Sequence, residues 1–233
     1  IKTLEEAEKE CVNEELSNYL GFLDNEWEFN KPPNTFRIIA LGDSFTEDRC
    51  VHYNETWPKQ LEKKLNNLNL SLKFEVFNMG RGGINIFQKV EVLKKIGLPF
   101  HPDMIILQYF WDDYISSSEV EKKGRELWIK YKKGELSFSP SFERVIHNAP
   151  EEIVSRIFYG ITLDEYLTTA NLDEEFNRWT KIPLLELINI TKKMKIKLLV
   201  ILIPDLSGDK PPSYDDEVIR ILQKYGIDFY DFS

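Results

Sequence analysis

The stretch Arg37-Ile38-Ile39-Ala40-Leu41-Gly42-Asp43-Ser44-Phe45-Thr46 joins an apolar run to a small polar cluster. Four consecutive apolar residues, Ile38 to Leu41, are too few for a helix and are typical of a strand buried on both faces of a parallel sheet. Gly42 ends that strand, which places Asp43 and Ser44 at its carboxyl end, where open α/β sheets bind their ligands. Backbone N–H groups are free at such a strand-to-helix turn, so a serine there can serve as a nucleophile.

Further apolar runs alternate with helical patterns along the chain. Short runs predict four more strands, at 74–77, 104–107, 198–203 and 227–232. Apolar residues at helical spacing predict helices that begin near Thr56, Ile86, Leu184 and Val218. This alternation specifies a three-layer α/β/α sandwich with a mostly parallel sheet. Five strands favour the flavodoxin-like order 2-1-3-4-5.

The length of 233 residues fits one large α/β domain. We expect residues 1–36 to form an N-terminal helix and an extended lead-in, and residues 37–233 to form the α/β domain. Residues 114–180 are less regular and richer in charged and aromatic side chains. They predict an insertion between core elements, with helical stretches around 143–158 and 173–179.

The chain is acidic, with a formal net charge of −9 and a pI of about 5.1. This charge argues against non-specific nucleic-acid binding, because phosphate neutralisation needs a basic surface. The two cysteines, Cys11 and Cys50, are too few for a disulfide framework, and we expect both to be free thiols.

No apolar run approaches the length of a membrane span, and no signal peptide precedes the first predicted helix. The chain starts at Ile1 without a methionine. The sequence is therefore compatible with a cytoplasmic protein. It is equally compatible with a secreted or membrane-anchored protein from which an upstream segment has been removed.

Three short motifs follow the first three predicted strands, and in this order they resemble the blocks of the SGNH or GDSL hydrolases. That family contains esterases, lipases and other acyl-ester hydrolases. Gly42-Asp43-Ser44-Phe45 is similar to the first block, and Asn78-Met79-Gly80 to the second. Phe110-Trp111-Asp112-Asp113 occupies the place of the third block, which is normally an Asn-Asp pair. The resemblance extends from about residue 19 to 232, apart from the insertion.

The resemblance implies a carboxylic ester hydrolase of the esterase, lipase or deacetylase type that forms an acyl-enzyme on Ser44. It assigns the oxyanion to the backbone N–H groups of Ser44 and Gly80, and to the third-block position, here Asp112. The implied partner is a small-molecule ester, such as an acylated sugar or lipid, and neither a cofactor nor a metal ion is implied. We expect the substrate-binding residues to be Asp43, Phe45, Arg81, Trp111 and Asp113.

Two features depart from the family pattern. Asp112 stands where the family has asparagine, and an ionised carboxylate cannot donate to an oxyanion and would repel it. The family carries its base on an Asp-x-x-His motif after the fifth strand, whereas this sequence ends at Asp231-Phe232-Ser233 without that motif. We expect the base to lie beyond the residues given.

The three histidines are weaker candidates for the base. His52 lies in the loop after the nucleophile and is the one placed nearest to it. His101 precedes a predicted strand and belongs at the opposite end of the sheet, and His147 lies in the insertion.

Several alternative interpretations stay open. Ser44 also suits a helix cap, and Asp43 and Asp113 suit the satisfaction of loop N–H groups. There are three rival functions. The chain can be read as a degenerate SGNH-fold protein that only binds a ligand or partner, or as an O-acyltransferase that uses the same serine. The third is an unrelated flavodoxin-like protein that binds a flavin or nucleotide.

Overall fold

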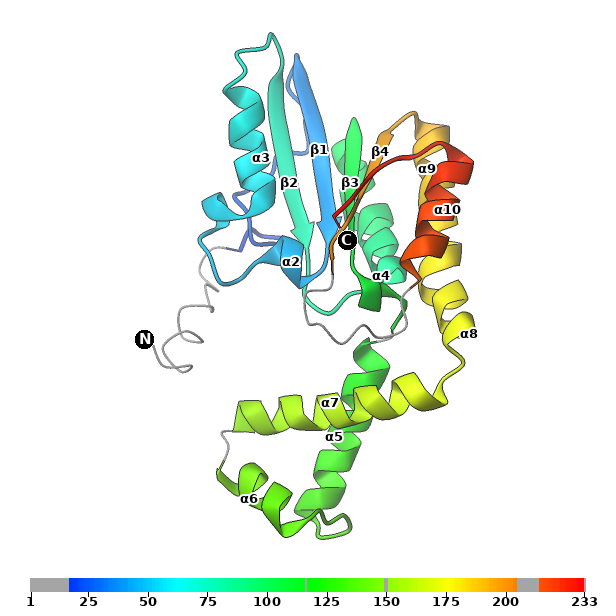
Figure 1. Ribbon diagram of the computed structural model, residues 1–233. Coiled ribbons are helices and arrows are strands. Elements are labelled where there is room, and N and C mark those ends of the chain that lie inside the picture. Colours follow the sequence, from blue (N-terminus) through cyan, green and yellow to red (C-terminus); the bar gives the residue numbers. More distant parts are fainter. Residues whose placement is uncertain (1–16, 116, 149–150, 205–213, 233) are drawn as a thin grey trace. The chain divides into compact units, whose positions relative to one another are not determined.

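The computed structural model describes residues 17–115, 117–148, 151–204 and 214–232 (Figure 1). The chain forms two compact units, Ile1–Tyr114 with Phe176–Ser233, and Ile115–Glu175. The predicted N-terminal helix lies almost entirely outside the described residues.

The first unit is built on a five-stranded parallel sheet in the order β2-β1-β3-β4-β5, which confirms the predicted topology. Gly42 of β1 pairs with Gly80 of β2, and Leu41 pairs with Leu107 of β3, so the carboxyl ends of three strands lie at one edge. The strands are β1 (Thr35–Gly42), β2 (Lys73–Gly80), β3 (Met104–Tyr109), β4 (Lys197–Leu202) and β5 (Asp228–Asp231).

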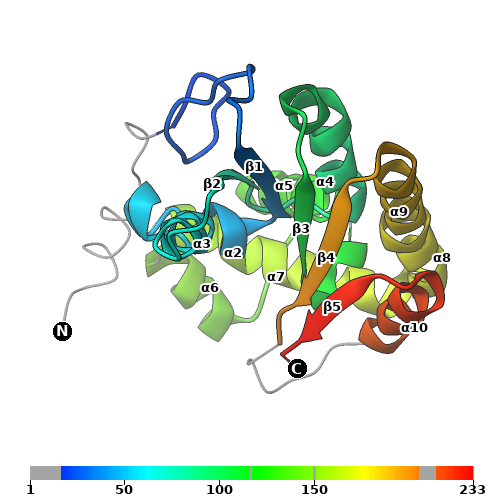
Figure 2. The ribbon, with the colours of Figure 1, turned by 90° about the horizontal axis from the view of Figure 1, so that it is seen from above.

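Helices cover both faces of this sheet (Figure 2). Helix α3 (Trp57–Asn66) lies on one face, and α4 (Ile86–Val92), α9 (Ile182–Met194) and α10 (Asp215–Tyr225) lie on the other. The remaining short elements of this unit are α2 (Ser44–Glu47), η2 (Tyr53–Glu55), η3 (Leu93–Gly97), η4 (Leu98–Phe100), η5 (Trp111–Tyr114) and η6 (Asn177–Lys181), with α8 (Leu172–Phe176) at the boundary between the units.

The interior strand β1 is buried on both faces, as its apolar run predicted. Ile38 and Ala40 belong to the cluster that packs against α3. Ile39 points the other way, toward Gly97 at the end of the helical stretch that follows α4. A strand enclosed in this manner holds the turn that follows it in a fixed place.

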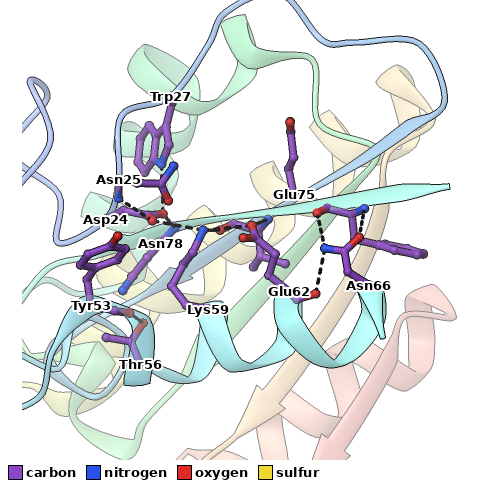
Figure 3. Close-up of polar contacts among 12 residues, drawn as sticks. Asp24, Asn25, Trp27, Tyr53, Thr56, Lys59, Glu62, Asn66, Glu75 and Asn78 are labelled. Atoms are coloured by element: carbon purple, nitrogen blue, oxygen red, sulfur yellow. Dashed lines mark hydrogen bonds and ion pairs between the residues drawn. The ribbon is translucent and has the colours of Figure 1, made fainter. Parts of the chain in front are cut away.

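The lead-in, residues 17–34, packs against β2, and it contains a tight turn closed by a bridge between Ser17 and Leu23 where the sequence predicted an extended segment. The indole of Trp27 stacks on the ring of Phe77, with centroids 4.7 Å apart. Asp24 accepts hydrogen bonds from the backbone N–H of Asn78 (2.9 Å) and from Trp27 Nε1 (3.0 Å), and it lies 3.2 Å from Lys59 Nζ (Figure 3). These contacts fasten the lead-in to the outer strand of the sheet.

The expectation of free thiols is wrong for Cys50, which is disulfide-bonded. Cys11, the only other cysteine in the sequence, lies outside the described residues. Two cysteines far apart in sequence carry no spacing pattern that would indicate a bond, because pairing depends on the distance between them in the fold.

The second unit is helical, with α5 (Ser117–Lys132), α6 (Pro140–Asn148) and α7 (Glu151–Thr169). Its core includes Ile146, Val154 and Phe158, packed against aromatic side chains of α5 and the following loop. At Gly124 a side chain would meet the carbonyl of Phe158 at 3.3 Å, so this glycine lets α5 and α7 approach closely. Within the described parts of the chain, no helix is both long and apolar enough to cross a membrane.

Candidate active site

Ser44 is exposed at the point where β1 ends and α2 begins. The preceding Asp43 is the N-cap, and its Oδ1 accepts a hydrogen bond from the Phe45 N–H at 2.9 Å. Short polar side chains are favoured there because they satisfy backbone donors that the helix leaves open. Among the described residues, the N–H of Ser44 itself has no hydrogen-bond partner. The turn therefore presents a hydroxyl and a free backbone donor together.

Two glycines let α2 lie directly on the ends of β1 and β2. A side chain at Gly42 would overlap Thr46, and one at Gly80 would overlap the backbone of Thr46 and Glu47. The N–H of Gly80 donates to Oδ1 of Asn78 at 3.0 Å. Gly80 thus serves close packing, and its N–H, which the sequence predicts as an oxyanion donor, is bonded to Asn78 in this structure.

The loop after β2 brings another donor near Ser44. The N–H of Gly82 donates to Glu47 Oε2 at 2.7 Å, and the opposite carboxylate oxygen lies 2.8 Å from Arg49. A Cβ placed on Gly82 would lie 3.8 Å from the Cβ of Ser44. Gly83 follows with φ of +72°, a conformation that favours glycine, and its N–H has no partner within the described part of the chain.

A buried lysine lies beneath the turn and connects it with the end of β3. Nζ of Lys89, from α4, lies 2.7 and 2.8 Å from the two carboxylate oxygens of Asp113. It also lies 3.3 Å from Asp43 Oδ2 and donates to the carbonyl of Gln108 at 3.0 Å. The Lys89 side chain is 0% exposed and that of Asp113 is 1% exposed. One ammonium therefore contacts two carboxyl groups from two different strand ends.

Gln108 completes this buried network. Its Nε2 donates to Asp43 Oδ2 at 2.9 Å, and its Oε1 accepts from the Asp43 N–H at 3.0 Å and from Thr46 Oγ1 at 3.1 Å. Asp113 also accepts from the Phe110 N–H at 2.9 Å, and its carbonyl accepts from Thr180 Oγ1 at 3.0 Å. Asp43 and Asp113 satisfy loop N–H groups and face inward, so Asp113 is out of reach of a substrate.

Burial and charge act in opposite directions on the groups of this cluster. Burial alone would lower the pKa of Lys89, but Asp113 and Asp43 outweigh it and raise that pKa above its ordinary value. Burial raises the pKa of Asp113 to about 8, although Lys89 opposes the shift. The cluster thus holds more carboxyl groups than its single cation can neutralise.

The remaining predicted residues lie around the turn at different depths. Phe45 is 48% exposed and contacts Phe110, with ring centroids 4.9 Å apart, and Trp111 lies 5.8 Å from Phe110. Asp112 is half-buried on η5, next to Asp113. Arg81 extends over the ring of Phe22 in the lead-in, at 5.7 Å, rather than toward Ser44.

The three histidines have contacts of their own. His52 is exposed, and its Nδ1 accepts from the Asn54 N–H at 3.3 Å. His101 precedes β3 and lies at the amino end of the strands. His147 belongs to the second unit, where its ring contacts the carbonyl of Glu143.

Sequence reasoning missed Lys89, Gln108 and Glu47. A signal existed for Lys89, because it lies three residues after Ile86 and four before Leu93, on the apolar face of its helix. A lysine on such a face is buried and requires partners. Gln108 and Glu47 carry no such signal, since their partners come from distant segments. Among the described residues, no group of three or more histidine, cysteine or acidic side chains is arranged to hold a metal ion.

Comparison with known proteins gave similar solved structures only; no family model and no curated protein matches the chain. The esterase AlinE4 of the SGNH-hydrolase family has a TM-score of 0.47 and 14% identity, over 85% of this chain and 77% of its own. TesA has a TM-score of 0.48 and 9% identity, over 83% and 76%. The psychrotrophic esterase EstA from Pseudoalteromonas sp. has a TM-score of 0.46 and 11% identity, over 85% and 77%.

Proposed function

We propose that this protein is a serine-dependent carboxylic ester hydrolase with Ser44 as its nucleophile. The observation that carries the proposal is the exposed Ser44 at the carboxyl end of β1, whose own N–H has no partner among the described residues. Such a position combines a group that can attack a carbonyl with a donor for the charge that then develops.

The reaction would proceed in two steps. The Ser44 oxygen attacks the ester carbonyl, a base accepts its proton, and the alcohol leaves to give an acyl-serine that water then hydrolyses. The N–H groups of Ser44 and Gly83 are the donors that we assign to the oxyanion, since Gly80 and Gly82 already donate to Asn78 and Glu47. One such donor is typically worth about 10²–10³ in rate. The resemblance gives the role of the base to the histidine of an Asp-x-x-His motif.

The substrate that we propose is a small ester with its acyl group on a sugar or lipid. Phe45 and Phe110 offer a partly exposed aromatic surface immediately beside the nucleophile. Aromatic faces bind both acyl chains and the apolar faces of sugar rings, which supports this class of ligand.

A fluorophosphonate probe tests the nucleophile directly. We expect the full-length protein to gain one covalent adduct by intact mass and the Ser44→Ala variant to gain none. Ser71→Ala is the matched control, because Ser71 is also exposed but lies in the turn before β2, and that variant should label like the wild type. An adduct that persists in Ser44→Ala would refute the assignment.

Asp112 favours one second candidate, a binding protein that has lost turnover. Its carboxyl replaces an amide donor and would repel an oxyanion when ionised. This candidate predicts that the full-length protein stays unlabelled while an ester still binds, as measured by calorimetry.

A further inference from the structure

We infer that Lys89 is a positioning residue that fixes the nucleophile turn relative to the loop that carries Asp112. The inference rests on the proposed function, because it concerns the geometry in which Ser44 reacts. Lys89 itself is fully buried on α4 and cannot touch a substrate.

The partners of Lys89 flank both reactive positions. Asp43 immediately precedes Ser44, and Asp113 immediately follows Asp112. The ammonium contacts both carboxyl groups, at 3.3 Å and 2.7 Å, and so connects the turn after β1 with η5 after β3. A shift of either loop would break a contact to a buried charge, which is costly where water cannot replace it.

The other contact seen between these two loops is aromatic, with the rings of Phe45 and Phe110 at a centroid distance of 4.9 Å. Gln108 ties Asp43 to β3 itself. Thr180 and the Phe110 N–H hold Asp113 without reaching the nucleophile turn. Removal of Lys89 would therefore leave both loops folded on their own supports, joined by the half-exposed Phe45 ring and no longer by a buried charge.

A double-mutant cycle tests this role through the rate of fluorophosphonate labelling at Ser44. We expect Lys89→Met to lower the maximal labelling rate constant about 10²-fold with little change in probe affinity, since displacements of about 1 Å have effects of this size. Asp113→Ala should lower it similarly, and the double variant should be no slower than the slower single variant.

The matched control is Lys59→Met, which removes a buried lysine that is 7% exposed and contacts Asp24, Glu62 and the carbonyl of Val76. Each variant is assayed at a temperature where its circular dichroism shows it to be folded, and Lys59→Met should label within about threefold of the wild type. If Lys89→Met does not fold, Lys89→Gln takes its place. The glutamine amide can still donate to one acceptor, so we expect a loss of labelling rate between those of the wild type and Lys89→Met.

The outcomes separate this inference from the proposed function. If the wild type is labelled and the folded Lys89 variants are labelled at the same rate, the positioning role is overturned, while the reactive serine stands. The positioning role is also overturned if the fold-loss in labelling rate of the double variant equals the product of the losses of the two single variants, because the two residues would then act independently. An unlabelled wild type would instead refute the reactive serine.

Discussion

Ser44 and Asp112 follow the neighbouring strands β1 and β3, and under the proposed function their chemistry would determine how well the site works. The N–H of Ser44 has no partner among the described residues, and in the proposed reaction Gly83 would supply a second neutral donor. The third position carries a carboxyl group where the resemblance calls for an amide. We therefore expect charge at this single residue to limit the stabilisation of an oxyanion.

Replacement of Asp112 by asparagine tests that limit. We expect Asp112→Asn to raise the rate of ester hydrolysis at neutral pH by about tenfold or more, because an amide donor replaces a carboxylate that repels the oxyanion. Initial rates with p-nitrophenyl acetate at pH 7 measure the effect. Asp216→Asn, a similar change in the first turn of α10, is the control. A lower rate in Asp112→Asn would mean that the carboxyl group itself takes part in the reaction.

At the scale of elements, β2 and the lead-in depend on buried Asp24. Its side chain faces Lys59, the Asn78 N–H and the Trp27 indole, and burial raises its pKa despite these partners (Figure 3). Loss of this carboxyl group would leave a lysine and two N–H donors with fewer acceptors in the interior.

We expect Asp24→Ala to lower the free energy of unfolding by about 3 kcal/mol or more. Urea denaturation followed by tryptophan fluorescence measures the change. Lys95→Ala, which removes an exposed ion pair with Glu91, should have no resolvable effect. Similar stabilities of the two variants would show that the lead-in contributes little to the sheet.

The elements were largely predictable because their signals are local. Apolar runs bounded by glycine and proline marked all five strands, and helical spacing marked α3, α4, α9 and α10. Helix α5 was missed because its sequence, with Gly124 at its centre, has a weak apolar stripe. The hydrogen bond from the Gly80 N–H to Asn78 was not predicted, because no spacing rule reveals such a contact.

At the scale of the molecule, the buried cluster links pH with folding. Burial raises the pKa of Asp113 to about 8 from an ordinary value of 3.8, so the folded state keeps a proton that the unfolded state releases. The corresponding stability is fully present below about pH 4 and is lost as the pH rises through about 8.

We therefore expect the free energy of unfolding to decline between pH 5 and pH 8, by up to about 1.4 kcal/mol per pH unit from this group. Asp113→Asn cannot titrate and should show a flatter profile over that range. Urea titrations at four pH values compare the two proteins. Parallel profiles would contradict a raised pKa at Asp113.

The convergence of the strand ends followed from the predicted order, since parallel strands place their carboxyl ends at one edge. What holds those ends together did not follow. Lys89 comes from α4, and its partners come from two other segments, so the network depends on tertiary contacts that a single sequence does not encode locally.

The most direct measurement is the capture of an acyl-enzyme. The full-length protein is mixed briefly with p-nitrophenyl acetate, quenched with acid, digested and analysed by mass spectrometry. We predict an acetyl group on the peptide that contains Ser44, and its absence in Ser44→Ala together with the loss of turnover. Ester turnover that continues in Ser44→Ala, with no acetyl group on Ser44 in the wild type, would contradict the account.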